Sequence, residues 1–264
     1  MNNNNAPIGV IDSGLGGLSV LQHLISDIPN ESYIYFSDNA YCPYGKKSFA
    51  EIQSRVFDIV RFLIDKYNVK LVVVACNTAT AAAIDELRAN FPIPFVGMEP
   101  AIKPAALKTK TGVIGVLATE GTFNGRLFKN TYEKYATEAT MIVTAGNNLV
   151  EYIEAGIVDG TDIENLLKNY IDPMVTNNAD LLVLGCTHFP FLSDTIKTLY
   201  PKLNLIDPAP AISKQTLNIL KINDIESAST SGNRLFFTSG DPILFNQFLK
   251  FHLSISEECQ RVDI

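Results

Sequence analysis

The sequence lacks a long apolar segment and an excess of basic residues, and each shortage excludes a class of protein. No run approaches the roughly 18 to 20 consecutive apolar residues that a membrane-spanning helix needs, so we expect no membrane partner. Acidic residues number 28 against 21 basic ones, which gives a formal net charge of −7. A nucleic-acid partner is not expected, because proteins that bind phosphate backbones carry a basic surface.

Cysteine is also scarce, with only Cys42, Cys76, Cys186 and Cys259 present. The first residues, Met1–Asn5, are an asparagine tract and not a basic segment followed by an apolar one. We therefore predict a frayed terminus and no signal peptide. Without an export signal, disulfide bonds are not expected, and the chain is predicted to be cytoplasmic with free thiols.

Apolar residues are abundant, at 47% of the 264 residues, while 19% are charged. This composition is typical of a globular protein with an ample core, and the length allows one large domain or two of ordinary size.

One stretch occurs twice and organises the rest of the chain. Lys70–Thr80 reads K-L-V-V-V-A-C-N-T-A-T, and Asp180–Pro190 reads D-L-L-V-L-G-C-T-H-F-P. Each is a short apolar run that ends in a small residue and a cysteine, which predicts a parallel strand buried on both faces. The cysteines then lie at the carboxyl ends of strands, where open α/β sheets bind ligands.

The remaining chain alternates predicted strands and helices, which favours mostly parallel sheets. Ser48 and Glu51 form a capping box before a long helix. Further strands are expected at 8–11, 33–36, 94–97, 114–119, 138–144 and 235–237, and helices at 18–29, 78–90, 123–135, 147–156, 163–175, 211–220 and 242–251. Residues 224–233 are polar and rich in serine, which predicts a mobile loop.

The second half of the chain repeats the plan of the first. The run 114–119 parallels 8–13, and the two cysteines are separated by a similar interval. We predict an α/β fold of two pseudo-duplicated parallel-sheet domains with the active site in the cleft between them. Domain 1 comprises residues 1–97 and 207–264, because the last section is expected to return to the first half, and domain 2 comprises residues 98–206.

Cys76 and Cys186 are the candidate reactive groups. A cysteine thiol has an ordinary pKa of about 8.5, and a helix N-terminus lowers it. Such a thiol exchanges a proton near neutral pH, as a general acid or base must. Either cysteine alone is better explained as an inert buried residue. Two in matching contexts favour a racemase or epimerase, in which one thiol takes a proton from a carbon and the other protonates its opposite face.

His188, Asp12 and the glycine-rich Gly14–Gly17 have more than one interpretation. His188 is either a structural hydrogen-bonding residue or a proton partner that tunes Cys186. Asp12 is a partner of Cys76, a partner of a substrate ammonium, or a plain helix N-cap. The glycines are not a dinucleotide fingerprint and favour close approach of a small anion to a helix N-terminus. Pro43–Gly45 is a lid or a plain turn.

Four segments together resemble the signature segments of the bacterial glutamate racemases of the cofactor-independent aspartate/glutamate racemase family. They are Ile11–Gly17, Pro43–Gly45, Ala75–Ala79 and Gly185–Pro190. Either cysteine segment alone would be a weak signal, but the four occur in the order of the family over the first three quarters of the chain.

The resemblance implies interconversion of L- and D-glutamate, supply of D-glutamate for peptidoglycan in the cell wall, no cofactor, no metal, and a homodimer. It implies that Cys76 and Cys186 are the acid/base pair, with Asp12, His188 and Glu154 as catalytic partners. The substrate contacts that it implies are Asp12, Ser13, Tyr44, Gly45, Asn77, Thr78, Thr119, Thr187 and His188. For the acidic residue, Glu151 is the alternative to Glu154.

Three other functions compete with this interpretation. Aspartate racemase belongs to the same family. A zinc hydrolase would use Cys76, Cys186, His188 and Asp12 as ligands, although no C-x₂-C pair is present. A two-domain amino-acid-binding module would bind glutamate without exchanging its Cα proton. The motifs show no pyridoxal-binding lysine, and two thiols make such a cofactor unnecessary.

Overall fold

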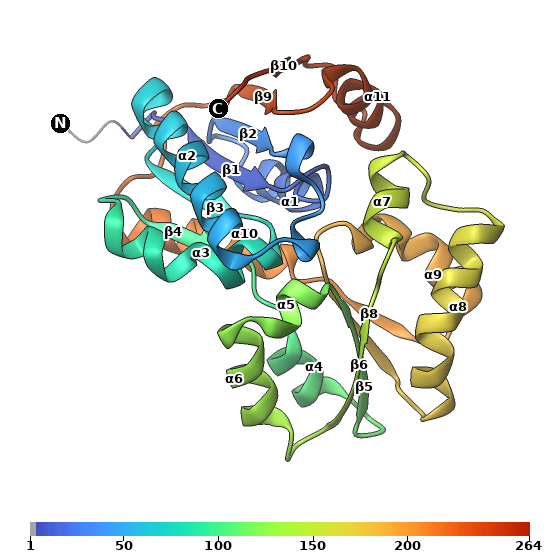
Figure 1. Ribbon diagram of the computed structural model, residues 1–264. Helices are drawn as coiled ribbons and strands as arrows, with labels where there is room; N and C mark the ends of the chain where they lie inside the picture. The colour runs from blue at the N-terminus through green and yellow to red at the C-terminus, as the bar shows by residue number, and fades with distance from the viewer. Residues whose placement is uncertain (1–3) are drawn as a thin grey trace. The chain divides into compact units, whose positions relative to one another are not determined.

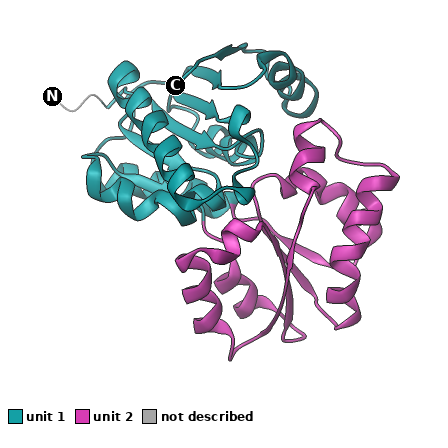
Figure 2. Ribbon diagram, in the orientation of Figure 1, with its two compact units in different colours: residues 1–98, 209–264 teal, residues 99–208 magenta. Residues whose placement is uncertain are grey.

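The computed structural model describes residues 4–264 and separates into two compact units. Unit 1 comprises residues up to Met98 and Ala209–Ile264, and unit 2 comprises Glu99–Pro208 (Figure 2). That residues 1–97 with 207–264 and residues 98–206 fold as independent domains stays a prediction.

Unit 1 contains a six-stranded sheet in the order β10-β9-β2-β1-β3-β4, with every pair parallel (Figure 1). Its strands are β1 (Ile8–Asp12), β2 (Tyr33–Ser37), β3 (Leu71–Val74), β4 (Phe95–Gly97), β9 (Arg234–Thr238) and β10 (Cys259–Arg261). Its helices are α1 (Leu18–Asp27), α2 (Phe49–Tyr67), α3 (Asn77–Asn90), α10 (Ala209–Ile222) and α11 (Pro242–Leu253), with 3₁₀ turns η1 (Asn39–Tyr41) and η2 (Tyr44–Lys46). Strands β1, β2 and β3 are buried along their whole length, as continuous apolar runs require.

Unit 2 contains a four-stranded parallel sheet in the order β6-β5-β7-β8. Its strands are β5 (Val113–Ala118), β6 (Thr140–Ala145), β7 (Leu181–Gly185) and β8 (Asn204–Ile206). Its helices are α4 (Ile102–Lys108), α5 (Glu120–Asn124), α6 (Arg126–Tyr135), α7 (Leu149–Glu154), α8 (Thr161–Thr176) and α9 (Ser193–Leu199), with the 3₁₀ turn η3 (Phe189–Leu192).

The first four strands of each unit have the same order in their sheet. In each, the second strand of the unit pairs with the first, the first with the third, and the third with the fourth. Strand β5 is therefore the counterpart of β1, and β7, which precedes Cys186, is the counterpart of β3, which precedes Cys76. The predicted pair of parallel-sheet α/β halves is confirmed. The final section does return to the first half, because β9 pairs with β2.

Several predicted element boundaries are wrong in detail. The helix expected over 123–135 is two helices, because Gly125 adopts an extended conformation between α5 and α6. Helices α4 and α9 and strands β8 and β10 were not predicted. They have only seven or three residues each, too few to show a helical or strand period.

The capping box before α2 is confirmed. The Ser48 hydroxyl accepts a hydrogen bond from the Glu51 backbone N–H, and the Glu51 carboxylate accepts one from Ser48. Behind it, one face of α2 is buried at Ile52, Val56, Ile59, Val60 and Leu63.

Of the terminus that was expected to fray, Met1–Asn3 lie outside the described residues. The side chains of Asn4 and Asn5 form hydrogen bonds with the 224–228 segment, and fraying stays a prediction. Residues 224–233 are irregular, as predicted; their mobility stays a prediction. Across the described part of the chain, no helix has the length and apolar character that crossing a membrane requires.

A buried ion pair joins distant segments of unit 1. The Lys70 ammonium lies 2.6 Å from a Glu31 carboxylate oxygen, with side-chain exposures of 6% and 2%. The other Glu31 oxygen accepts a hydrogen bond from the backbone N–H of Ser227 at 2.8 Å. The pair therefore ties the segment before β3 to the loop after α1 and to the 224–233 loop.

We expect Lys70→Met to lower the free energy of unfolding by about 3–5 kcal/mol, because it leaves the Glu31 carboxylate buried without its cation. Replacing both partners, as in Glu31→Leu with Lys70→Met, should cost less, because no unpaired charge remains. Urea denaturation measures both, with Lys66→Met, at an exposed position, as the matched control. A single variant as stable as the control would contradict the prediction.

Candidate active site

Cys76 lies between β3 and α3, at the position that the repeated stretch predicts. It is the N-cap of α3, and its Sγ accepts a hydrogen bond from the backbone N–H of Ala79 at 3.4 Å. The residue is 6% exposed, and the Sγ lies 3.8 Å from the Ser13 hydroxyl. The thiol therefore lies among the first N–H groups of a helix, where the positive end of the helix dipole stabilises a thiolate.

Asp12 ends β1, and the following glycine-rich turn closes on it. Its carboxylate accepts a hydrogen bond from the backbone N–H of Gly14 at 2.8 Å. A Cβ atom on Gly17 would lie 2.6 Å from the Asp12 Cβ, so only glycine lets the turn come this close. The interpretation of Asp12 as a plain N-cap of α1 is wrong, because Gly17 occupies that position and α1 has no side-chain cap.

Asn77 and Thr78 begin α3 directly behind Cys76, and both are 3% exposed. Neither the Asn77 amide oxygen nor its nitrogen has a hydrogen-bond partner within the described chain. An unsatisfied buried polar group costs about 1–3 kcal/mol. A bound polar molecule would remove that cost, which fits the predicted substrate contact.

The predicted contacts Tyr44 and Gly45 lie in η2, which packs against α3. Tyr44 is 2% exposed, and its hydroxyl donates a hydrogen bond to Asp38 at 2.6 Å. Burial, reinforced by the negative charge of Asp38, raises the pKa of Tyr44 well above its ordinary value. The hydroxyl is therefore a neutral donor whose proton is committed to Asp38.

Cys186 follows β7 in unit 2, at the position equivalent to Cys76. It is 7% exposed, and its Sγ lies 3.7 Å from Nδ1 of His188. The preceding residue must be small, because a Cβ atom on Gly185 would lie 2.7 Å from the Ala118 Cβ of the neighbouring strand. Thr187 is also buried.

His188 connects Cys186 to a carboxylate. Its Nε2 is hydrogen bonded to Oε1 of Glu154, at the end of α7, and the two form an ion pair when the imidazole is protonated. His188 is also the N-cap residue of η3. The structure brings Glu154 to the histidine. Glu151 lies instead near Tyr170, whose pKa is raised mainly by burial and further by the charge of Glu151.

Thr119, another predicted substrate contact, follows β5 as Ser13 follows β1. Its hydroxyl caps α5 by accepting a hydrogen bond from the backbone N–H of Thr122 at 3.3 Å. It also lies 3.0 Å from the Thr122 hydroxyl. This local role does not prevent a substrate contact, because a hydroxyl oxygen accepts two hydrogen bonds.

The two thiols occupy equivalent positions with different surroundings. Cys76 has a hydroxyl and a backbone N–H beside it, whereas Cys186 has a histidine backed by a carboxylate. Cys186, His188 and Glu154 are all residue types that bind zinc, so the zinc alternative stays to be tested by experiment. The roles of all the predicted site residues stay predictions.

The other cysteines are different in character. All four cysteines are free, as expected. Cys259 is buried in β10, and burial raises its pKa to about 12, so this thiol stays protonated at neutral pH.

The sequence analysis did not identify Asp38 and Arg55. Asp38 accepts the hydrogen bond of the Tyr44 hydroxyl, and Arg55 donates two hydrogen bonds to Asp38. The only local signal for this pair is an aspartate at a strand end.

Comparison with known proteins agrees with this architecture. The model of the Asp/Glu/Hydantoin racemase family matches residues 8–216. A glutamate racemase of Herpetosiphon aurantiacus is 44% identical over 241 residues, which cover 90% of this chain and 94% of that protein.

Two solved structures are similar over nearly all of the chain. A glutamate racemase isoform from Bacillus anthracis gives a TM-score of 0.88 at 33% identity and covers 99% of both chains. The glutamate racemase of Francisella tularensis, solved in complex with D-glutamate, gives a TM-score of 0.84 at 32% identity and covers 98% of both chains. The chain belongs to the Asp/Glu/Hydantoin racemase family.

Proposed function

We propose that the chain interconverts L- and D-glutamate without a cofactor, by a two-thiol acid/base mechanism. The observation that carries the proposal is the pair of buried cysteines at equivalent strand ends of a duplicated sheet. The names of relatives that match nearly the whole chain support glutamate as the substrate. We further propose that the enzyme is a cytoplasmic homodimer that supplies D-glutamate for peptidoglycan.

In the proposed reaction, one cysteine as thiolate removes the proton from Cα of glutamate. The resulting carbanion is planar at Cα, and the other cysteine as thiol donates a proton to its opposite face. Each turnover leaves the two cysteines with exchanged protonation states, so the reverse reaction uses them in reversed roles. Two bases are needed because a single thiol would return the proton to the face that it came from.

His188 and Glu154 serve Cys186 in this proposal. The carboxylate fixes the orientation of the imidazole and stabilises its protonated form, and the imidazole passes the proton on to the sulfur or takes it up. Asp12 serves Cys76 or the ammonium of the substrate. The hydroxyl and amide groups of Ser13, Asn77, Thr78, Thr119 and Thr187 and the Tyr44–Gly45 segment would hold the two carboxylates.

We expect Cys76→Ser and Cys186→Ser each to lower the rate of racemisation by about 10²–10⁴-fold, the usual contribution of a positioned acid or base. Circular dichroism with each glutamate enantiomer measures the rate. Cys259→Ser is the matched control, because it changes a buried thiol that stays protonated. Full activity in either site variant would contradict the two-thiol mechanism.

Deuterium uptake at Cα in D₂O separates the proposal from its rivals. An amino-acid-binding module would bind glutamate with no uptake, and no uptake from either enantiomer would reject a racemase. A zinc hydrolase would lose activity with a chelator, whereas the two-thiol enzyme should not. Parallel assays with D- and L-aspartate test the alternative substrate, and faster racemisation of aspartate would overturn the preference for glutamate.

We expect Glu154→Gln to slow racemisation roughly 10- to 100-fold, less than loss of a thiol, because the histidine loses its charged partner but Cys186 remains. The equilibrium constant between enantiomers is one, so kcat/KM falls equally in both directions in every variant. Primary isotope effects with Cα-deuterated substrate can nevertheless differ. The effect should rise for the enantiomer that Cys186 deprotonates and fall for the other.

Glu151→Gln is the matched control for this experiment, since it changes the other acidic residue of α7. Isotope effects that shift equally for both enantiomers in Glu154→Gln would contradict a role specific to Cys186.

A further inference from the structure

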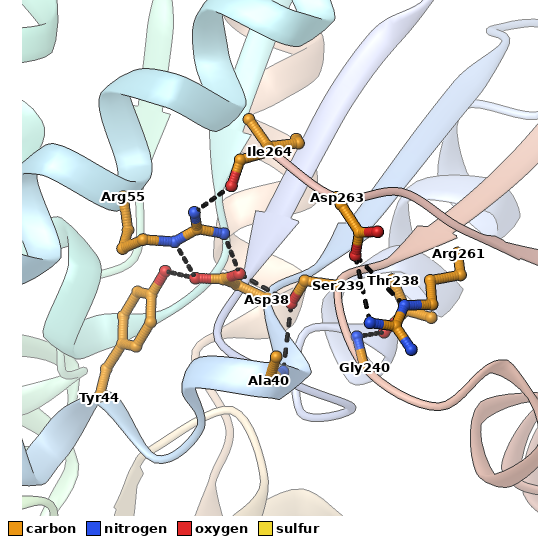
Figure 3. A network of polar contacts seen from close by, with 10 residues as sticks. All are labelled: Asp38, Ala40, Tyr44, Arg55, Thr238, Ser239, Gly240, Arg261, Asp263 and Ile264. Atoms are coloured by element: carbon orange, nitrogen blue, oxygen red, sulfur yellow. Dashed lines mark hydrogen bonds and ion pairs between the residues drawn. The ribbon is translucent and has the colours of Figure 1, made fainter.

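A buried carboxylate outside the predicted site residues collects hydrogen bonds from three side chains. Asp38 follows β2 and is fully buried. Its Oδ1 accepts from Arg55 Nη2 at 2.6 Å and from the Ser239 hydroxyl at 2.8 Å. Its Oδ2 accepts from the Tyr44 hydroxyl at 2.6 Å and from Arg55 Nε at 3.1 Å (Figure 3). The carboxylate is thus bound by a two-pronged guanidinium and by two hydroxyls.

Arg55 also makes several contacts. Besides the two bonds to Asp38, its Nη1 donates to the main-chain oxygen of Ile264 at 2.6 Å (Figure 3). Its guanidinium carbon lies 4.0 Å from the centre of the Tyr41 ring. The planar guanidinium binds both carboxylate oxygens and also stacks on an aromatic ring. A lysine ammonium has neither the planar shape nor the fixed pair of donors that this requires.

Within the Asp38–Arg55 ion pair, Asp38 is the residue that contacts the candidate site of unit 1. Its backbone N–H donates to the main-chain oxygen of Asp12 at 2.9 Å, next to the turn that carries Ser13. Its carboxylate receives the Tyr44 hydroxyl, and Tyr44 lies in η2, which packs against the helix that Cys76 caps. The ion pair therefore stands behind two segments that bear predicted substrate contacts.

We propose that Asp38 and Arg55 are positioning residues for substrate binding. Their ion pair anchors the Tyr44 hydroxyl and thereby fixes the backbone of Tyr44 and Gly45 where the substrate binds. The proposal rests on the proposed function, in which that segment contacts glutamate. It also assigns the Tyr44 side chain a task different from a direct substrate contact, because its only proton is given to Asp38.

The Glu31–Lys70 pair is a natural control. It is an ion pair of the same unit with similarly buried charges, but it joins segments that hold no predicted site residue. A purely structural role for Asp38 and Arg55 would give the same kinetic result as loss of Lys70, namely lower stability with unchanged catalysis in the folded protein.

The test measures kcat and KM for both enantiomers in Tyr44→Phe, Arg55→Lys, Asp38→Asn and Lys70→Met. All are assayed at a temperature at which circular dichroism shows the variant folded. We expect kcat/KM to fall about 10- to 100-fold in the first three, mainly through KM, because a displaced binding segment costs this much while both thiols remain. Lys70→Met should change it less than twofold. If Tyr44→Phe, which removes one oxygen atom, keeps kcat/KM within twofold, the proposal is overturned.

A second readout does not depend on racemase activity. Amide hydrogen exchange of residues 39–47 in the substrate-free protein should be at least tenfold faster in Arg55→Lys than in Lys70→Met. Unchanged exchange would overturn the positioning role even if glutamate is racemised. If the exchange accelerates but the wild-type protein does not racemise glutamate, the anchoring is supported, and the proposed function fails separately.

Discussion

The parallel pairing of the first and third strands in each unit is the constraint on which the surroundings of both candidate cysteines depend. In unit 1, Ile11 pairs with Val74, and the backbone N–H of Ala75 donates to the Ile11 oxygen. This register places the end of β1, with Asp12 and Ser13, beside Cys76. In unit 2, Ala118 pairs with Gly185, which places Thr119 beside Cys186. A slip of one residue would turn each of these side chains to the other face of its sheet.

The first four strands have the same order in both units, but the side chains at the strand ends differ. Counting from the paired strands, Ala118 stands where Asp12 stands in the first unit, so unit 2 has no carboxylate at that strand end. The carboxylate near Cys186 is instead that of Glu154 in α7, and His188 lies between this carboxylate and the thiol. The proposed two-thiol mechanism does not require the two cysteines to have equal surroundings, and the side chains beside equivalent strand ends differ.

Much of this arrangement is readable from local sequence. Both cysteine strands, the capping box at Ser48 and the duplicated order follow from apolar runs and helix-start residues within a few positions. Local sequence does not distinguish Glu154 from Glu151, and only the resemblance favours Glu154. The folded chain brings Glu154 against His188, which lies 34 positions away.

Features that depend on contacts between distant residues could not be predicted from the sequence. Asp38 gives no periodic signal, and its partners lie 6, 17 and 201 positions away. The strands β8 and β10 are formed by three residues each, which pairing with a neighbouring strand stabilises. The break between α5 and α6 depends on the conformation of one glycine, and a helical stripe on both sides of it conceals that break.

The return of the chain to the first sheet has a consequence for biosynthesis. Strand β2 is an interior strand in the finished protein, but its neighbour β9 follows about 200 residues later, after all of unit 2. At ribosomal speeds of roughly 5–20 residues per second, β2 therefore waits about 10–40 s with one edge unpaired. An unpaired edge of a buried apolar strand can pair with another chain. During this period another polypeptide can form the hydrogen bonds that β9 later makes with β2.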